Sequence, residues 1–332
     1  MRFEGKKCLV IGGAGFIGSN LSRKLVEEGA TVTILDDFFT GSLLVVRAYK
    51  ATIIKGSITE FDLVDKLMGD ADIVFNMACR NIIVSTKEPR KDFDVNAGGM
   101  VNILISAKEH PNIKRIVFAS SASVYGNARY FPINEDEGFF ALNPYAASKI
   151  AAESACIASQ EMYGVPVTIL RYSNVYGVGQ VASNPYCGAI SKFFECVEKK
   201  IPMQIHGDGL QTRDFTYIDD VVEATLLSAL SPRAVGEIFN VGTGVETKII
   251  DLVELICKRT DYYAVTYIDR RDIDNVRRRV MNTEKIRRYL RWIPTVNLAT
   301  GIERTYEWFK KSYKETDLDQ VMIEEGYERN QV

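Results

Sequence analysis

A glycine-rich turn near the start of the chain constrains the fold more than any other sequence feature. It reads Gly12-Gly13-Ala14-Gly15-Phe16-Ile17-Gly18 and contains the spacing GxGxxG together with GxxGxxG. The apolar run 8–11 precedes this turn, and the stretch 16–28, with helical spacing of its apolar residues, follows it. A strand, a glycine turn and a helix in this order are typical of a dinucleotide site, because backbone N–H groups and the positive end of the helix meet a pyrophosphate.

An acidic residue after the next apolar run supports the dinucleotide interpretation. Asp36 follows Gly18 by 18 residues, and its carboxylate can accept hydrogen bonds from both hydroxyls of a ribose. Asp37 adds a second negative charge that would repel a 2′-phosphate, so we expect NAD rather than NADP. The alternative is that the glycines only form a tight turn, and the strand, helix and acid together disfavour it.

Strand-like and helix-like segments alternate through the first half of the chain. Apolar runs lie at 8–11, 31–35, 53–54, 73–75, 115–118 and 167–170, and helical spacing at 16–28, 89–109 and 144–163. This alternation predicts an α/β fold in which βαβ units form a parallel sheet. After about Arg171 the loops lengthen, and helices are predicted at 189–198, 221–230 and 249–259. We expect a cofactor-binding domain at 1–170, a smaller lobe at 171–312 with segments returning to the first domain, and a polar tail at 313–332.

Composition argues against several classes of protein. The net charge is −2, from 41 Lys and Arg against 43 Asp and Glu, which disfavours a nucleic-acid partner. The chain has only two histidines, His110 and His206, which are too few to favour a histidine-rich metal site or a histidine-based catalytic triad. We therefore predict no metal. Six scattered cysteines are typical of reduced thiols, and no apolar run approaches the length of about 20 residues that a membrane helix needs. We therefore expect a cytoplasmic protein with no membrane partner.

A tyrosine and a lysine four residues apart form the candidate catalytic pair. Tyr145 and Lys149 lie on one face of the helix predicted at 144–163, and a nearby ammonium favours the phenolate and lowers the pKa of a tyrosine. Such a tyrosine can act as a general base toward a sugar hydroxyl. Ser120, Ser121 and Ser123 follow the strand predicted at 115–119, at the edge of the sheet where ligands bind. A solvated helix face and an ordinary serine-rich turn are the alternative interpretations.

Taken together, these motifs resemble the extended short-chain dehydrogenase/reductases, specifically the NAD-dependent nucleotide-sugar epimerase/dehydratase family, with a pattern similar to that of UDP-sugar 4-epimerases. The similarity covers about 7–310. It rests on the ordered segments 12–18, 36–41, 96–99, 120–126, 145–149, 171–177, 207–215 and 239–244. The resemblance implies a Rossmann-type, doubly wound parallel sheet with a smaller mixed α/β substrate lobe at its carboxyl edge.

The resemblance also implies roles for individual residues. Tyr145 is the expected catalytic base, Lys149 its electrostatic partner, and Ser121 the residue that hydrogen-bonds the 4-hydroxyl of the sugar. The expected NAD-binding residues are Gly12, Gly15, Phe16, Ile17, Gly18, Asp36, Ser57, Ile58, Ala78, Asn96, Lys149 and Tyr172. The expected binding residues for a nucleotide-diphosphate sugar, a UDP-sugar by the resemblance, are Ser121, Tyr145, Asn174, Arg213 and Arg271.

Two positions between the catalytic serine and Val124 bear on the reaction type. Dehydratases of the family have an Asp-Glu pair there, and UDP-glucuronate decarboxylases have Glu at the second position, whereas this chain has Ala122 and Ser123. The remaining set predicts a UDP-glucose/UDP-galactose type 4-epimerase that works through a transient 4-keto sugar. The alternatives are a UDP-glucuronate epimerase or decarboxylase, a 2-epimerase, retention of the keto sugar as product, and a non-catalytic NAD-binding regulator.

Some positions depart from the family pattern. Ser57 stands where the family usually has an Asp that holds the adenine amino group, so a weaker adenine contact is expected. Arg80 is unusual and within reach of either the cofactor or a substrate carboxylate, and Arg279 would crowd an N-acetyl group or pair with a uronate. Members commonly dimerise through a bundle of two helices per subunit, which predicts a homodimer through the helices at 100–108 and 146–162.

Overall fold

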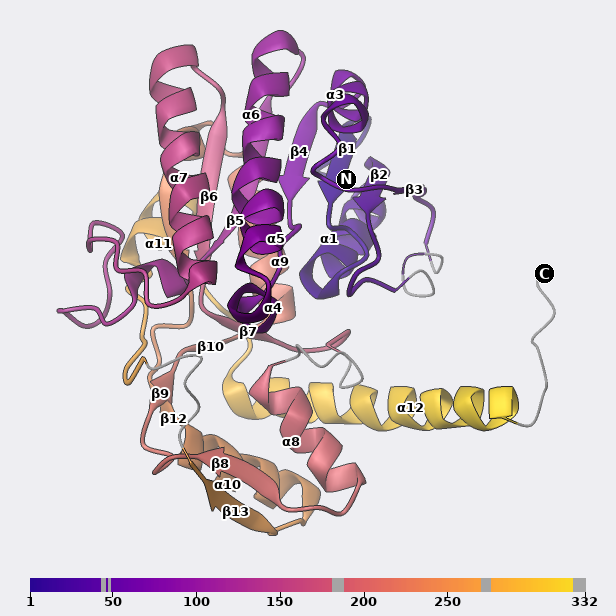
Figure 1. The fold of residues 1–332 in the computed structure, drawn as a ribbon, viewed down its shortest axis with the longest axis vertical. Coiled ribbons are helices and arrows are strands. Elements are labelled where there is room, and N and C mark those ends of the chain that lie inside the picture. Colours follow the sequence, from indigo (N-terminus) through magenta and orange to yellow (C-terminus); the bar gives the residue numbers. More distant parts are fainter. Residues whose placement is uncertain (43–45, 47–48, 181–187, 270–275, 325–332) are drawn as a thin grey trace.

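A seven-stranded parallel sheet forms the centre of the chain (Figure 1). Its strands, in spatial order, are β11 (Ile238–Val241), β6 (Val167–Tyr172), β5 (Arg115–Ser121), β4 (Ile73–Asn76), β1 (Lys7–Ile11), β2 (Thr31–Asp36) and β3 (Thr52–Lys55). This computed structural model describes residues 1–42, 46, 49–180, 188–269 and 276–324, with side chains described up to 312. The predicted Rossmann-type parallel sheet is confirmed.

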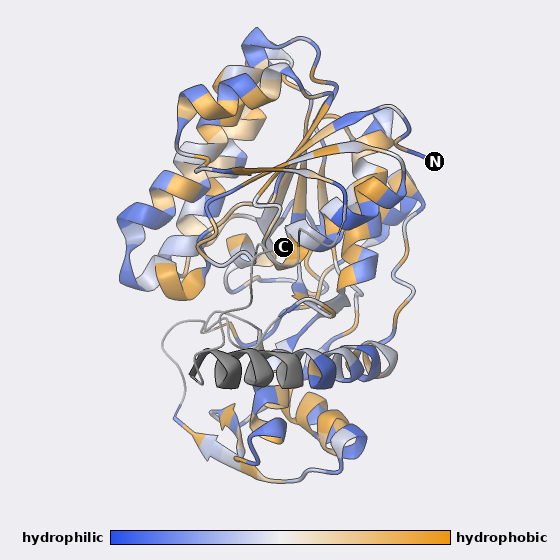
Figure 2. Cartoon of the chain, turned by 90° about the vertical axis from the view of Figure 1, so that its right-hand side faces the viewer, coloured by the Kyte–Doolittle hydropathy of each residue, from blue (hydrophilic) through white to orange (hydrophobic). Residues whose placement is uncertain are grey.

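Helices cover both faces of the sheet and bury its apolar side chains in two clusters. One face is covered by α1 (Phe16–Glu27), α9 (Ile218–Leu230) and α11 (Glu284–Leu290). The other face is covered by α3 (Phe61–Gly69), α6 (Gly99–Glu109) and α7 (Pro144–Tyr163). The central strands are mostly hydrophobic, whereas the helices carry both hydrophobic and hydrophilic residues (Figure 2). This is the pattern expected of parallel strands that are buried on both sides.

Helix α7 carries the predicted tyrosine and lysine, and its ends are set by local chemistry. The Asn143 side chain accepts a hydrogen bond from the backbone N–H of Ala146, and Pro144 occupies the first turn, where it loses no helical hydrogen bond. At the other end Gly164 has a φ of +68°, the left-handed conformation that ends many helices. These caps place Tyr145 in the first turn of α7, at the carboxyl edge of the sheet.

The helix predicted at 89–109 is interrupted in the structure. It begins as α5 (Pro89–Phe93), continues as a π-helical turn η1 (Asp94–Gly98), and becomes α6. The short helix α4 (Ile82–Lys87) precedes it and begins at Asn81, whose side chain accepts from the N–H groups of Ile83 and Val84. Single π-turns are frequent at functional sites, and this turn contains Asn96, one of the predicted site residues.

A smaller lobe is attached at the carboxyl edge of the sheet (Figure 1). Its elements, with the segments that connect it to the sheet, are η2 (Ala122–Tyr125), β7 (Asn174–Tyr176), α8 (Ala189–Glu198), β8 (Met203–His206), β9 (Thr212–Arg213), β10 (Phe215–Tyr217), η3 (Pro232–Ala234), β12 (Thr247–Lys248), α10 (Ile249–Thr260), β13 (Val265–Ile268) and α12 (Leu298–Glu324). They form three two-stranded sheets, of which β7–β10 and β8–β13 are parallel and β9–β12 is antiparallel. Within the described part of the chain, no helix combines the length and apolarity needed to cross a membrane.

Candidate active site

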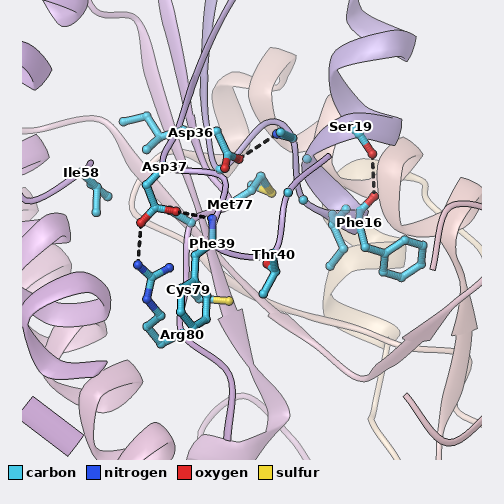
Figure 3. A pocket seen from close by; sticks show the side chains of 18 of the residues that line it. Phe16, Ser19, Asp36, Asp37, Phe39, Thr40, Ile58, Met77, Cys79 and Arg80 are labelled. Carbon is cyan, nitrogen blue, oxygen red and sulfur yellow. Dashed lines mark hydrogen bonds and ion pairs between the residues drawn. The ribbon is translucent and has the colours of Figure 1, made fainter. Parts of the chain in front are cut away.

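A cavity of about 650 Å³ lies over the glycine-rich turn, at the carboxyl ends of β1, β2 and β4 (Figure 3). Eight of the predicted NAD-binding residues line it: Gly12, Gly15, Phe16, Ile17, Gly18, Asp36, Ile58 and Ala78. The glycine turn and the acid at the end of β2 therefore face the same space, although they come from different strands. The cavity has the position that a dinucleotide occupies in a doubly wound sheet.

The glycine turn has the close approaches that this position requires. Gly12 has a φ of +77°, and a Cβ atom there would lie 2.5 Å from the backbone nitrogen of Ala78. Helix α1 begins after Gly15, and no side chain caps its first turn. The N–H groups of a first helical turn have no intrahelical acceptor, so they are available to an anion. This cradle fits the pyrophosphate of NAD.

Asp36 is held rigidly at the ribose end of the cavity. Its Oδ2 accepts a hydrogen bond of 2.8 Å from the backbone N–H of Ala14, and its Oδ1 accepts one of 2.8 Å from that of Phe38. Burial raises the pKa of the carboxyl group, and the two backbone hydrogen bonds oppose that effect. The residue is buried, yet it lines the cavity, where its remaining lone pairs fit the hydroxyls of a ribose.

The three predicted catalytic side chains meet where β5 ends and α7 begins. Ser121 is the last residue of β5, and its hydroxyl lies close enough to that of Tyr145 to lower the pKa of the phenol. The Lys149 Nζ atom lies 5.9 Å from the centre of the Tyr145 ring and donates a 2.8 Å hydrogen bond to the carbonyl of Ala119. A hydroxyl, a phenol and an ammonium group thus form one cluster at the carboxyl edge of the sheet.

The protonation chemistry of this cluster differs from the prediction. Burial raises the pKa of Tyr145, and the nearby hydroxyl of Ser121 and the charge of Arg279 lower it only in part. Burial also lowers the pKa of Lys149, whereas the nearby carboxylates of Asp92 and Glu153 raise it. The expectation that the nearby Lys149 lowers the pKa of Tyr145 below its ordinary value is therefore wrong, because the removal of water from both groups dominates.

A buried ion pair between α7 and β6 lies next to this cluster. Glu153 lies one helical turn after Lys149, and its carboxylate accepts a 2.7 Å hydrogen bond from Nη2 of Arg171 on β6. Ser120, next to the catalytic serine, donates its hydroxyl to the same carboxylate. Both charged side chains are almost completely buried. The pair therefore fixes the distance between α7 and the ends of β5 and β6.

A second buried carboxylate lies on the other side of α7. Asp92 accepts hydrogen bonds from Ser85 and, at 2.6 Å, from the side chain of Asn96. The predicted NAD residue Asn96 also donates to the hydroxyl of Ser148 at 3.1 Å, and its oxygen accepts from the backbone N–H of Arg80 at 2.8 Å. Asn96 therefore connects α7 to the wall of the cofactor cavity, and the cavity lining does not include it.

A second cavity, of about 730 Å³, lies between the sheet and the smaller lobe. Asn174, Arg213 and His206 line it, and Gln180 lines both cavities, so the two are adjacent. The Asn174 Oδ1 atom is buried without a hydrogen-bond partner among the described residues, which suits a donor on a bound ligand. Arg277 lines the same cavity and makes two hydrogen bonds, of 2.7 and 2.8 Å, to Asp208.

The structure does not bring every predicted residue to these cavities. Tyr172 lies in the apolar cluster under α9, where its hydroxyl bonds that of Thr225 at 2.7 Å, so its position argues against a place beside the nicotinamide. The Ser57 hydroxyl is hydrogen-bonded to that of Thr59 at 2.8 Å and is absent from the cavity lining. Arg271 lies outside the described residues.

The cofactor cavity also contains Arg80, which the sequence places within reach of either the cofactor or a substrate carboxylate. Arg80 lines the cavity with Phe39, beside Asp37 and Met77 (Figure 3). Arg80 follows the end of β4, and ligands bind at the carboxyl ends of the strands in a parallel sheet.

Comparisons with known proteins agree with this geometry. A sequence model of the NAD dependent epimerase/dehydratase family matches residues 8–242. A putative UDP-glucose 4-epimerase from Methanocaldococcus jannaschii is 37% identical over 307 residues, which cover 92% of this chain and 98% of that protein. The structure of a UDP-glucose 4-epimerase from Thermotoga maritima with UDP-glucose superposes with a TM-score of 0.88 at 32% identity, covering 92% of this chain and 99% of that one. A UDP-glucuronic acid 4-epimerase from Bacillus cereus, in complex with UDP-glucuronic acid and NAD, gives 0.85 at 28% identity, covering 92% and 100%.

Proposed function

The chain belongs to the NAD-dependent epimerase/dehydratase family, and from the cluster of Ser121, Tyr145 and Lys149 we propose that it is a nucleotide-sugar 4-epimerase of the UDP-glucose/UDP-galactose type. The observation that carries the proposal is the meeting of Ser121, Tyr145 and Lys149 at the carboxyl edge of the sheet, the same edge that carries a cavity fitting NAD. The relatives with this activity and the fit of the second cavity to an extended ligand support it.

Each side chain of the cluster has a task in this reaction. Tyr145 accepts the proton of the sugar 4-hydroxyl in its phenolate form, which burial disfavours and the charge of Arg279 favours, and Ser121 holds that hydroxyl by a hydrogen bond. Lys149 stabilises the phenolate by its charge, and the negative groups around it help to keep it protonated. When bound, NAD supplies a reversible hydride acceptor for C4 of the sugar.

The nucleotide end of the substrate is held apart from the reacting carbon. Asn174 and Arg213 lie in the second cavity, where the Arg213 side chain also donates to the carbonyls of Thr212 and Val276 at 2.8 and 2.9 Å. A fixed guanidinium group suits a diphosphate. With the nucleotide anchored there, the 4-keto sugar can turn its other face before Tyr145 returns the proton. The product is the 4-epimer.

The end of β5 favours epimerisation over elimination of water. Ala122 is a buried methyl group, and the hydroxyl of Ser123 accepts a 3.1 Å hydrogen bond from that of Ser121. Neither side chain can remove a proton from C5 of the sugar or protonate a leaving 6-hydroxyl. An acid–base pair at these two positions is what a dehydratase needs, so the minimal catalytic set supports an epimerase.

A second candidate is a 4-epimerase of UDP-glucuronate. Arg279 is buried, and its positive charge is close enough to Tyr145 to lower the pKa of the phenol. A buried guanidinium group beside the reacting carbon suits a sugar carboxylate. One structural neighbour of the chain is described as a UDP-glucuronic acid 4-epimerase.

The test is incubation of the purified protein with UDP-glucose, UDP-N-acetylglucosamine and UDP-glucuronate, followed by separation of the products by anion-exchange chromatography. We expect UDP-galactose from UDP-glucose, and no product from the Tyr145→Phe variant. A faster conversion of UDP-glucuronate to its 4-epimer selects the second candidate. Absence of an epimer from all three sugars, or release of CO₂ from UDP-glucuronate, contradicts the proposed function.

We also propose that the chain forms a homodimer through α6 and α7. The two helices pack against each other, and both carry large apolar side chains on the surface: Val101, Ile105, Ile157 and Met162. Light scattering after size-exclusion chromatography should give a dimer mass, and an Ile105→Asp substitution should give the monomer mass. A wild-type monomer contradicts this assignment.

A further inference from the structure

An ion pair crosses the ribose end of the cofactor cavity (Figure 3). The Arg80 Nη2 atom lies 2.5 Å from Oδ2 of Asp37, and the Arg80 guanidinium carbon lies 4.1 Å from the centre of the Phe39 ring. Asp37 and Phe39 follow β2, whereas Arg80 follows β4, so the pair joins the loops at the ends of two strands. All three residues line the cavity.

The arginine is held in this position from both ends. Its backbone N–H donates a 2.8 Å hydrogen bond to Oδ1 of Asn96, and its carbonyl accepts one of 3.1 Å from the same side chain. The Arg80 side chain is only 14% exposed, less than the 32% of Asp37. The backbone hydrogen bonds and the contact with the Phe39 ring hold the guanidinium group of Arg80 in the cavity. Rotation of the side chain still allows its terminal nitrogens to exchange one anion for another.

The pair changes the electrostatics of the ribose site. Negative charge on Asp37 raises the pKa of Asp36, and the positive charge of Arg80 lowers it, so both groups act on the carboxylate that meets the ribose. The formal charge of Asp36, Asp37 and Arg80 together is therefore −1, whereas the two aspartates alone would give −2. The negative charge of Asp37 is balanced by the positive charge of Arg80. Repulsion between Asp37 and a 2′-phosphate therefore does not explain why the site would bind NAD rather than NADP.

We propose that Arg80 is a specificity-determining residue of the dinucleotide site, and that Asp37 favours NAD by holding Arg80 away from the ribose. With Asp37 present, the guanidinium group is bound to a carboxylate. Without that carboxylate, it becomes a forked partner for the 2′-phosphate of an adenosine, the geometry for which arginine is suited. The proposal concerns the cofactor site, so it holds or fails independently of the sugar reaction.

The test is a double-mutant cycle on Asp37 and Arg80, read out as ligand binding. Isothermal titration of the nucleotide-free protein with NAD, NADP and adenosine 2′,5′-bisphosphate gives the dissociation constants, and denaturation of the purified protein releases the bound nucleotides for counting. Asp37→Asn should bind NADP and the bisphosphate about tenfold more tightly than wild type, the size of one charge-assisted hydrogen bond. Its affinity for NAD should change by less than about twofold.

The second substitution separates the proposal from direct repulsion. In Asp37→Asn with Arg80→Gln, we expect the tenfold gain to disappear, because no cation remains to bind the phosphate. If the double variant keeps the gain, Asp37 acts by its own charge and the proposal is wrong. It is also wrong if Asp37→Asn gains nothing.

Two controls exclude trivial outcomes. Arg90→Gln removes an arginine from an ion pair of 3.3 Å with Asp94 on the exposed side of the neighbouring helix, and it should leave all three affinities unchanged. The Asp37 Oδ1 atom accepts a 3.0 Å hydrogen bond from the backbone N–H of Phe39, which the amide oxygen of asparagine can replace. An unchanged far-UV circular dichroism spectrum therefore reports that the variant is folded, and Asp37→Ser is a second variant with the same expected result.

Discussion

The substitution Glu153→Gln tests whether the buried ion pair between α7 and β6 holds the catalytic cluster together. Glu153 is completely buried, and Arg171 is nearly so. The arginine directs three hydrogen bonds at this carboxylate, two of 3.1 Å from Nε and one of 2.7 Å from Nη2. Glutamine keeps the shape of the side chain but removes the charge. The variant therefore leaves a guanidinium group in the interior without its anion.

The size of the effect follows from that burial. Loss of one partner of a buried pair costs about 3–5 kcal/mol, because the remaining charge is desolvated and uncompensated. The lower end applies here, since the amide oxygen of glutamine still accepts one hydrogen bond, and Nη1 of Arg171 keeps the hydroxyl of Tyr125 and the carbonyl of Glu135, both at 2.8 Å. We expect a loss of about 3 kcal/mol from the free energy of unfolding, a large part of the usual total.

Urea unfolding followed by far-UV circular dichroism measures this loss. The matched control is Glu27→Gln, which removes a carboxylate from an exposed pair of 3.3 Å with Lys24 and should leave the urea midpoint unchanged. A turnover assay should show a further decrease in kcat for Glu153→Gln under conditions where the protein is folded, because Ser120 and α7 lose their common partner. A loss of stability below about 1 kcal/mol would refute the reasoning.

Three further substitutions test the site. Gly12→Ala places a Cβ atom 2.5 Å from the backbone of Ala78, so the purified variant should retain less than about a tenth of the wild-type NAD, whereas Gly138→Ala, with open space around it, should retain all of it. Lys149→Met should lower kcat by about 100-fold or more and move the rise of activity to higher pH, because the phenolate loses its cation; an unchanged pH profile contradicts this role. Asp92→Asn should move the whole pH profile of kcat to lower pH, because the charge of Asp92 raises the pKa of both Tyr145 and Lys149. A shift to higher pH would reverse the assigned sign.

The sequence predicts much of the central sheet, and it does so for a physical reason. Strands β1, β2, β4, β5 and β6 are rich in apolar residues, as expected of buried parallel strands. The ends of each strand lie within about three residues of the predicted ends. Strand β11 is not predicted, although it pairs in register with β6. Its four residues follow a long excursion through the smaller lobe, and nothing local determines which sheet such a short run joins.

The site is predictable only where a motif or a strand end places a residue. Asp36 and Ser121 end parallel strands, and both reach the ligand edge. The position of Tyr172 follows from the alternation of side chains along β6: Arg171 faces α7, so its neighbour faces α9. The contact between Asp37 and Arg80 joins residues 43 positions apart, and only the folded chain brings them together. The raised pKa of Tyr145 likewise depends on burial, which the spacing of residues does not reveal.

Conversion of UDP-glucose labelled with deuterium at C4 tests the central claim most directly. A 4-epimerase that uses Tyr145 for the proton and bound NAD for the hydride returns the label to the carbon from which it came. We therefore predict UDP-galactose that retains deuterium at C4, with no label in the solvent, and no product from Tyr145→Phe. Formation of no epimer, or of an epimer that has lost its deuterium to water, would contradict the account.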